Sequence, residues 1–270
     1  MYTNKSMNQK IISKHEKVYR SALLNRFITT QEAGEIVGKD ETARVILWRL
    51  VQRGRLQRIR GGLYAAVPPE SVGGAFEVDK YLLLSKAMRG KGALAFHSAL
   101  ELHGVAYSSF NEVYGMSEIW IPRLSFQGVR YRVVRTENLF GTATIFRDDV
   151  PLLVTDKERT FLDCVRRPDL SGGLEEIVKS YSGFRQLSPV LLLDYLARFD
   201  EDSLYQRAGY FLELLQREIK VPDDLILALQ GHVSKVRYPL VAGSGKSGLV
   251  RDVRWNVLFP SNISEVIRSV

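Results

Sequence analysis

The sequence of 270 residues has one cysteine, four histidines and no apolar run long enough (about 18 residues) to form a transmembrane helix. The single cysteine, Cys164, cannot form a disulfide within the chain, which favours a reducing compartment. One cysteine among scattered histidines also argues against a structural zinc site, which usually needs four clustered ligands. The polar first residues lack the apolar core of a secretory signal. We therefore expect a cytoplasmic protein of one or two domains, with no metal and no other cofactor.

Acidic residues are scarce in the first quarter of the chain. Residues 1–68 contain 13 Lys and Arg against 5 Asp and Glu, which leaves 25 of each sign among the other 202 residues. The whole net charge of +8 therefore lies in that first quarter. A one-sided basic field of this kind favours a polyanionic partner. The alternative is a solvated surface that is merely rich in Lys and Arg.

Helix-boundary residues predict a helix-turn-helix near the N-terminus. Thr29 or Thr30 can cap a helix that begins near residue 31, and Glu32 would complete a capping box with Thr29. Gly38 can adopt the left-handed conformation that ends this helix. A second helix follows over residues 41–54. Two short helices joined by a short turn that contains glycine form a helix-turn-helix.

A helix over residues 10–26 precedes this motif, and a basic hairpin follows it. Residues 56–60 alternate between apolar and polar side chains, and residues 63–67 would form the returning strand. Gly61-Gly62 suits a two-residue turn of type I′ or II′. This order of elements predicts a winged helix-turn-helix in which the hairpin is the wing.

The second helix of the motif has the composition of a recognition helix. Five apolar side chains are expected to face the domain interior: Val45, Leu47, Trp48, Leu50 and Val51. The polar remainder, including Arg44 and Thr42, would face the major groove, where Arg pairs with guanine and Thr meets a base edge or the thymine methyl. Seven basic residues against two acidic ones between Lys39 and Arg60 favour DNA as the partner. The alternative is a winged helix that contacts proteins.

Beyond a linker at residues 68–74, helices and strands occur in separate runs, which predicts an α+β fold. Helices are expected at residues 75–88, 93–103, 156–166, 174–181, 188–198, 203–218 and 222–230. Strands are expected at residues 112–121, 128–135, 142–154, 236–242 and 249–258. The predicted architecture is an N-terminal winged helix-turn-helix, residues 1–68, followed by a larger mixed α+β domain, residues 75–270.

Two segments resemble ligand-binding motifs without their full pattern. Residues 241–247 resemble a phosphate-binding loop, but Leu240 stands where the motif needs glycine and a strand is expected to follow. We therefore expect a hairpin turn there. His97, Glu101 and His103 lack the spacing of a helical zinc motif, so a capped and packed helix is favoured over a metal site.

The start of the helix near residue 156 carries several charged side chains. Thr155 and Glu158 match a capping box. Three carboxylates lie close together in sequence: Asp156, Glu158 and Asp163. Capping of the helix N-terminus, together with an ion pair of Arg159, is favoured over a catalytic role for these carboxylates. Cys164, on the apolar face of that helix, is expected to be a buried core thiol.

Three segments, in this order, resemble a known family. They are LVQRGRLQRIRGGLYAA in the predicted wing, AFHSALELHGV after the linker, and VTDKERTFLDCVRRPDLSGGLEEIV in the second domain. The chain resembles the abortive-infection AbiEi antitoxins, which are the antitoxin half of type IV toxin–antitoxin systems. The likeness spans most of residues 30–180, and the last ninety or so residues add little to it.

The resemblance implies a non-enzymatic, two-domain regulator. Its winged helix would bind double-stranded DNA at repeats in its own promoter and repress the operon. Its second domain would counter a cognate nucleotidyltransferase-like toxin, in the usual type IV case without a stable complex. DNA contact is carried over to Lys39, Thr42, Arg44, Arg49, Arg53, Arg55, Arg58 and Arg60. An antitoxin surface is carried over to Asp156, Arg159 and Asp163. The alternative is that these residues only cap the helix and form an ion pair.

Two other functions remain open at this stage. A metabolite-sensing winged-helix regulator would hold a ligand pocket in its second domain. A nuclease would use carboxylates near residues 156–163 to hold metal ions, but the sequence has no recognisable metal-ligand pattern. A neighbouring reading frame for a nucleotidyltransferase-like protein would favour the antitoxin over the sensor.

Overall fold

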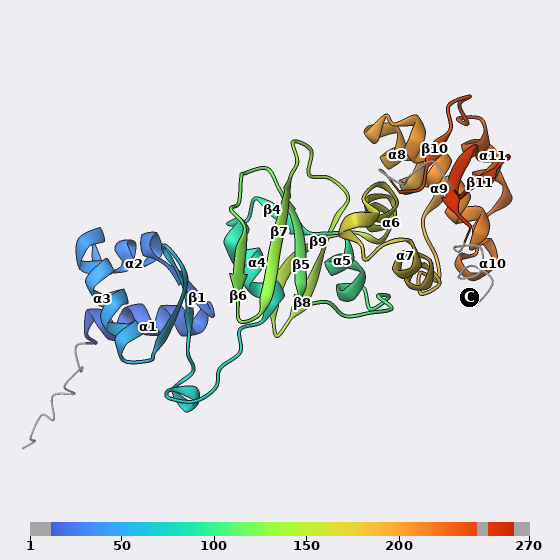
Figure 1. Cartoon of the computed structure of the whole chain (residues 1–270). Coiled ribbons are helices and arrows are strands. Elements are labelled where there is room, and N and C mark those ends of the chain that lie inside the picture. The colour runs from blue at the N-terminus through green and yellow to red at the C-terminus, as the bar shows by residue number, and fades with distance from the viewer. Residues whose placement is uncertain (1–11, 242–247, 262–270) are drawn as a thin grey trace, which may run out of the picture. The chain divides into compact units, whose positions relative to one another are not determined.

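The computed structural model describes residues 12–241 and 248–261, and it separates into a winged-helix unit, Met1–Asp79, and a second unit, Lys80–Val270. The fold is mixed α+β, as predicted (Figure 1). Across the described residues, no helix is both long enough and apolar enough to cross a membrane. Most of residues 241–247, the segment that resembles a phosphate-binding loop, lies outside the described residues, and strand β11 (Leu249–Asp252) follows it.

The first unit is a winged helix. Its elements follow in the order α1 (Lys14–Leu24), β1 (Phe27–Thr29), α2 (Thr30–Val37), α3 (Asp40–Gln52), β2 (Leu56–Arg60) and β3 (Leu63–Ala66). The strands form an antiparallel sheet in the order β1-β3-β2, beside which the three helices gather (Figure 1). Strand β1 is absent from the sequence-based prediction, because three residues carry too short a pattern to reveal a strand.

Both predicted boundaries of α2 are confirmed. The Glu32 amide donates to Thr29 Oγ1 over 3.2 Å, and the Thr29 amide donates to Glu32 Oε2 over 2.8 Å, which completes the capping box. Gly38 ends the helix with φ of 85°. A non-glycine residue would be strained in that left-handed conformation, so glycine is needed to turn the chain toward α3.

Helix α3 buries a different set of apolar side chains from the predicted one. Its core residues are Ala43, Ile46, Leu47 and Leu50. Val45 and Trp48, which we expected to face inward, are 48% and 61% exposed. The buried positions follow helical spacing, and Val45 and Trp48 lie on the opposite side of the helix. The prediction placed Val45 and Trp48 inside because they are apolar, and it left out Ile46, which is buried.

The turn of the wing also differs from the prediction. Of the two glycines between β2 and β3, only Gly62 has a positive φ, 78°. Types I′ and II′ both need a positive φ at the first central residue, Gly61, so neither describes this turn. The register shift between Arg58 and Arg60 marks a bulge in β2 that changes the twist of the hairpin. The Thr30 amide donates to Gly62 O over 3.0 Å and ties the wing to the start of α2.

The second unit begins with a six-stranded mixed sheet. After the short 3₁₀ helix η1 (Pro69–Ser71) of the first unit come α4 (Lys80–Met88), β4 (Gly92–Leu94), α5 (His97–Leu102), β5 (Glu112–Ser117), β6 (Leu124–Phe126), β7 (Val129–Arg135), β8 (Thr142–Arg147) and β9 (Val150–Thr155). The strand order is β6-β7-β5-β4-β9-β8. The helix predicted over residues 93–103 is wrong at its start, since β4 is a fully buried strand. Short apolar runs do not distinguish a buried strand from a helix.

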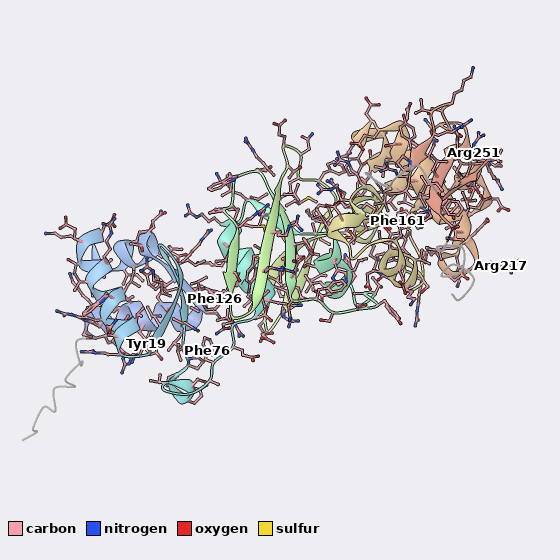
Figure 2. All side chains as sticks on the ribbon, in the orientation of Figure 1. Tyr19, Phe76, Phe126, Phe161, Arg217 and Arg251 are labelled. Carbon is pink, nitrogen blue, oxygen red and sulfur yellow. The ribbon has the colours of Figure 1, made fainter. Side chains whose placement is uncertain are left out.

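Helices dominate the rest of the second unit. They are α6 (Lys157–Arg166), η2 (Pro168–Leu170), α7 (Leu174–Tyr181), α8 (Pro189–Phe199), α9 (Asp202–Leu214), α10 (Gln216–Ile219) and α11 (Asp223–Gln230). A small sheet of β10 (Tyr238–Pro239), β12 (Val257–Pro260) and β11 follows. Phe161, labelled in Figure 2, belongs to the hydrophobic core that these helices share. Trp255 belongs to the same core and packs against Gly209.

Candidate nucleic-acid interface

Helix α3 and its two cap residues carry five of the eight predicted DNA-contacting side chains. Because the core residues lie on one side of the helix, the opposite side presents a line of four residues: Glu41, Val45, Trp48 and Gln52. Arg44 and Arg49 flank this line on its two sides. Both are exposed, and Thr42 is half-buried. Lys39 and Arg53 are exposed at the two ends of the helix.

Five of the predicted basic residues have no acidic partner in the described part of the chain. These exposed side chains are Lys39, Arg44, Arg49 and Arg53 around α3, and Arg58 on β2. A cation that is free of ion pairs keeps its full charge available to an external anion. The arrangement therefore gives the α3 and wing surface a positive potential that the fold does not neutralise.

Arg55 and Arg60 are held differently from these five. Arg55 lies 3.4 Å from Glu16 of α1, and its guanidinium lies 5.0 Å from the ring of Tyr19, which Figure 2 labels. The Tyr19 hydroxyl donates to Val67 O over 2.7 Å. Burial raises the pKa of Tyr19 above its ordinary value, although Arg55 opposes the shift, so Tyr19 stays a neutral donor. Arg60 is half-buried and has interactions within the protein.

In the second unit, Asp156 caps α6. Its Oδ1 accepts from the Arg159 amide over 2.8 Å, and its Oδ2 accepts from the Tyr195 hydroxyl over 2.6 Å. The predicted capping box of Thr155 with Glu158 is therefore wrong by one position. Thr155 is the last residue of β9, and its hydroxyl lies 2.8 Å from the Thr160 hydroxyl.

The predicted ion pair of Arg159 is present and buried. Arg159 Nε donates to Asp163 Oδ1 and Oδ2 over 3.0 and 2.9 Å, and its guanidinium lies 4.0 Å from the ring of Phe140. Burial raises the pKa of Asp163 to about 6, against the opposing charge of Arg159. The two side chains are 3% and 2% exposed, so neither can touch a partner directly. Of the predicted antitoxin surface, Asp156 alone stays accessible.

A buried polar network near α5 is not evident from the sequence. His97 Nε2 lies 3.1 Å from Glu176 Oε1, which also accepts from the Tyr107 and Ser108 amides over 3.0 and 2.9 Å. Burial raises the pKa of Glu176, but these hydrogen bonds outweigh it and hold the pKa below its ordinary value. No local pattern predicts this network, because His97 and Glu176 lie far apart in the chain.

The capped and packed helix expected at His97 to His103 is present and packed, but its N-cap residue Phe96 makes no side-chain cap hydrogen bond. His103 Nε2 lies 2.7 Å from Thr155 O, and Glu101 accepts from Lys80 Nζ over 3.2 Å and from the Tyr81 hydroxyl over 2.5 Å. Within residues 12–241 and 248–261, no group of three His, Cys, Asp or Glu side chains could hold a metal ion. Cys164 is buried, as predicted, and burial raises the pKa of its thiol.

Two adjoining hollows lie along the β6–β7 edge of the sheet. One has a volume of about 600 Å³ and the other about 520 Å³, and Glu112, Ser125 and Arg130 line both. Arg123 and Arg132 line the smaller one. The hollows are large enough for a small ligand.

The comparisons with known proteins bear on the fold alone. No protein-family model matches the chain, and no curated protein matches it. Among solved structures, the chain is similar to the RV2827C protein from Mycobacterium tuberculosis, with a TM-score of 0.65 over 96% of this chain and 95% of that chain. The sequence identity is 17%, so the two proteins share a fold over both units.

Proposed function

We propose that the chain is a DNA-binding repressor whose winged helix binds double-stranded DNA. One observation carries the proposal: a winged helix presents five exposed basic side chains that have no acidic partner among the described residues. Double-stranded DNA supplies a dense line of phosphates that matches it.

The geometry gives the basic residues different tasks. Helix α3 would enter the major groove, where Arg44 or Arg49 pairs with guanine. Arg58 on the wing would contact phosphates beside the groove, since a hairpin that follows a recognition helix reaches the adjacent backbone. Lys39 and Arg53, at the ends of α3, would contact the phosphates on either side. Contacts to phosphate set position and affinity, and contacts to bases set sequence preference.

A binding titration of the full chain tests this proposal. We expect tighter binding to a duplex of the gene's own upstream region than to a scrambled duplex. Arg58→Ala should weaken binding to both duplexes and lower the slope of log affinity against log salt by about one. The matched control is Arg217→Ala in the second unit, whose side chain is exposed (Figure 2) and which should keep the parent's slope. Equal slopes for Arg58→Ala and the parent would contradict the wing contact.

The resemblance to AbiEi antitoxins extends this proposal. We propose that the protein represses its own operon and that its second unit, without being an enzyme, counters a nucleotidyltransferase-like toxin. The support is the likeness of three segments, two of which lie in the second unit. Growth of cells that express the neighbouring toxin gene measures this activity. The parent should restore growth. Arg58→Ala should also restore growth, while it represses the operon less strongly than the parent does. Failure of the parent to restore growth would contradict the antitoxin role.

A metabolite-sensing regulator is the second candidate. The hollows along β6 and β7 favour it, because their arginines could hold an anionic metabolite. The discriminating measurement is DNA affinity with and without mononucleotides and sugar phosphates. A change that is absent in Arg132→Ala would support the sensor, and constant affinity would leave the antitoxin proposal in place.

A further inference from the structure

The outer face of α3 is apolar at its centre and basic at its edges. Val45 and Trp48 lie one helical turn apart on the same side, 48% and 61% exposed. Arg44 and Arg49 flank them. The winged-helix unit already has a closed core, to which α3 contributes Ala43, Ile46, Leu47 and Leu50. Val45 and Trp48 lie outside the core residues of this unit, and together they form what we call the apolar strip.

We propose that the apolar strip contacts the 5-methyl groups of thymines in the major groove, so that the preferred duplex has thymines where the strip lies. This inference rests on the proposed DNA-binding function and specifies its substrate. The thymine methyl is the apolar group that base pairs present in the major groove, and apolar side chains are its usual partners. A strip that lies between arginines would face base edges while the arginines reach guanines or phosphates on either side.

Charge argues against a second copy of the chain as the partner of the strip. Two copies that paired through α3 about a twofold axis would bring Arg44 and Arg49 of each protomer near the same residues of the other. These cations have no acidic partner in the described part of the chain, so the contact would be repulsive. Glu41 is the acidic side chain on the same line, and one carboxylate does not balance two arginines. A polyanion fits the basic flanks and the apolar centre together.

The experiment compares thymine with uracil in one duplex. A duplex is first selected from a random pool by binding to the full-length parent, and is then remade with deoxyuridine in place of every thymine. We expect the parent to bind the uracil duplex more weakly, by roughly 4-fold for each methyl that it buries, from about 0.8 kcal/mol per CH₂ group. The double variant Val45→Ala/Trp48→Ala should bind both duplexes with equal affinity. Trp48→Phe should keep part of the preference for thymine.

Leu24→Ala is the matched control. Leu24 is 84% exposed on α1, so its loss removes an exposed apolar side chain away from the strip and should keep the parent's ratio of affinities. The two outcomes that overturn the inference are a parent without preference for thymine, and an Ala variant that keeps the parent's preference. Sedimentation of the parent and the variants adds a third: loss of self-association with an unchanged thymine-to-uracil ratio would assign the strip to a protein contact. If no duplex can be selected at all, the DNA-binding proposal itself fails.

Discussion

Five basic side chains on α3 and the wing face solvent without an acidic partner in the described part of the chain, whereas several basic residues of the second unit are paired. Arg159 pairs with Asp163 inside the core, and Arg166, Arg167 and Lys179 pair with carboxylates nearer the surface. The same residue type thus stabilises the second unit and leaves charge available in the first. The positive surface of the first unit therefore reflects which cations folding leaves unpaired as well as how many there are.

Substitution of a paired basic residue and substitution of an unpaired one should have different consequences. Removing a paired cation from the second unit should change stability, because a carboxylate loses its partner. Removing an unpaired cation from α3 should change affinity for DNA with little change in stability, because no partner inside the protein depends on it.

The largest effect is expected for Arg159→Met. The substitution leaves Asp163 buried without a cation, which should lower the free energy of unfolding by about 3–5 kcal/mol. Chemical denaturation of the full chain measures this loss. The control is Arg167→Met, whose ion pair with Asp169 is half-exposed and should contribute at most about 1 kcal/mol. Equal losses for the two variants would contradict the difference between the buried and the exposed pair.

The pH dependence of Arg159→Met sharpens this result. Burial raises the pKa of Asp163 to about 6 in the parent, and Arg159 opposes the shift, so its removal should raise the pKa further. A raised carboxyl pKa costs nothing below the unfolded-state pKa, where both states are protonated, and the cost grows as pH rises through the folded-state pKa. The loss in the free energy of unfolding of Arg159→Met relative to the parent should therefore be smaller at about pH 5 than at about pH 8. An equal deficit at both pH values would mean that Asp163 is not the group left unpaired.

Arg44→Ala should produce the next largest effect, and on a different property. If Arg44 pairs with a guanine, its loss should weaken binding to the preferred duplex by about 1–3 kcal/mol and to a scrambled duplex by much less. The free energy of unfolding should change by less than about 0.5 kcal/mol, because the side chain is exposed. Titration and denaturation of the same preparation test both statements. A uniform loss on all duplexes would assign Arg44 to phosphate contact.

His103 should give the second unit a dependence on acid pH. Burial lowers the pKa of His103, although its hydrogen bond to Thr155 O opposes the shift. Because the folded-state pKa lies below the unfolded-state value, the contribution to stability is complete above the unfolded-state pKa and is lost as pH falls toward the folded one. His103→Gln should therefore lose less stability than the parent between about pH 7.5 and pH 5.5. Parallel stability curves would contradict this role.

Local patterns predicted much of this structure from the sequence. The capping box of Thr29 and Glu32, the helix end at Gly38, and an ion pair of Arg159, whose partner the structure identifies as Asp163, all involve residues within a few positions of each other. Their chemistry depends on helix geometry, which sequence spacing reveals. Cys164 was correctly placed in the core because its helix has one clearly apolar face.

Features that depend on tertiary contacts escaped prediction. The exposure of Trp48 also escaped prediction, although the helical spacing of Ala43, Ile46, Leu47 and Leu50 places Trp48 on the opposite side of α3. The short strands β1 and β4 exist because neighbouring strands pair with them, and three residues carry no period. The contact of His97 with Glu176 joins α5 to α7, which only the folded chain brings together. These features include the surface and the buried network on which function could depend.

The smallest effect on DNA binding is expected for Arg55. This arginine is ion-paired, although it lies in the same unit as the unpaired cations. Arg55 follows α3 directly, as a DNA-contacting residue would, but it already lies 3.4 Å from Glu16 and over Tyr19. Arg55→Ala should therefore change the salt slope of DNA binding by less than about one, and by less than Arg58→Ala does. Glu16→Gln supplies the converse test, because it releases Arg55 from its carboxylate and should strengthen binding at low salt. If Arg55→Ala matches Arg58→Ala while Glu16→Gln has no effect, pairing inside the unit does not decide which cations reach DNA.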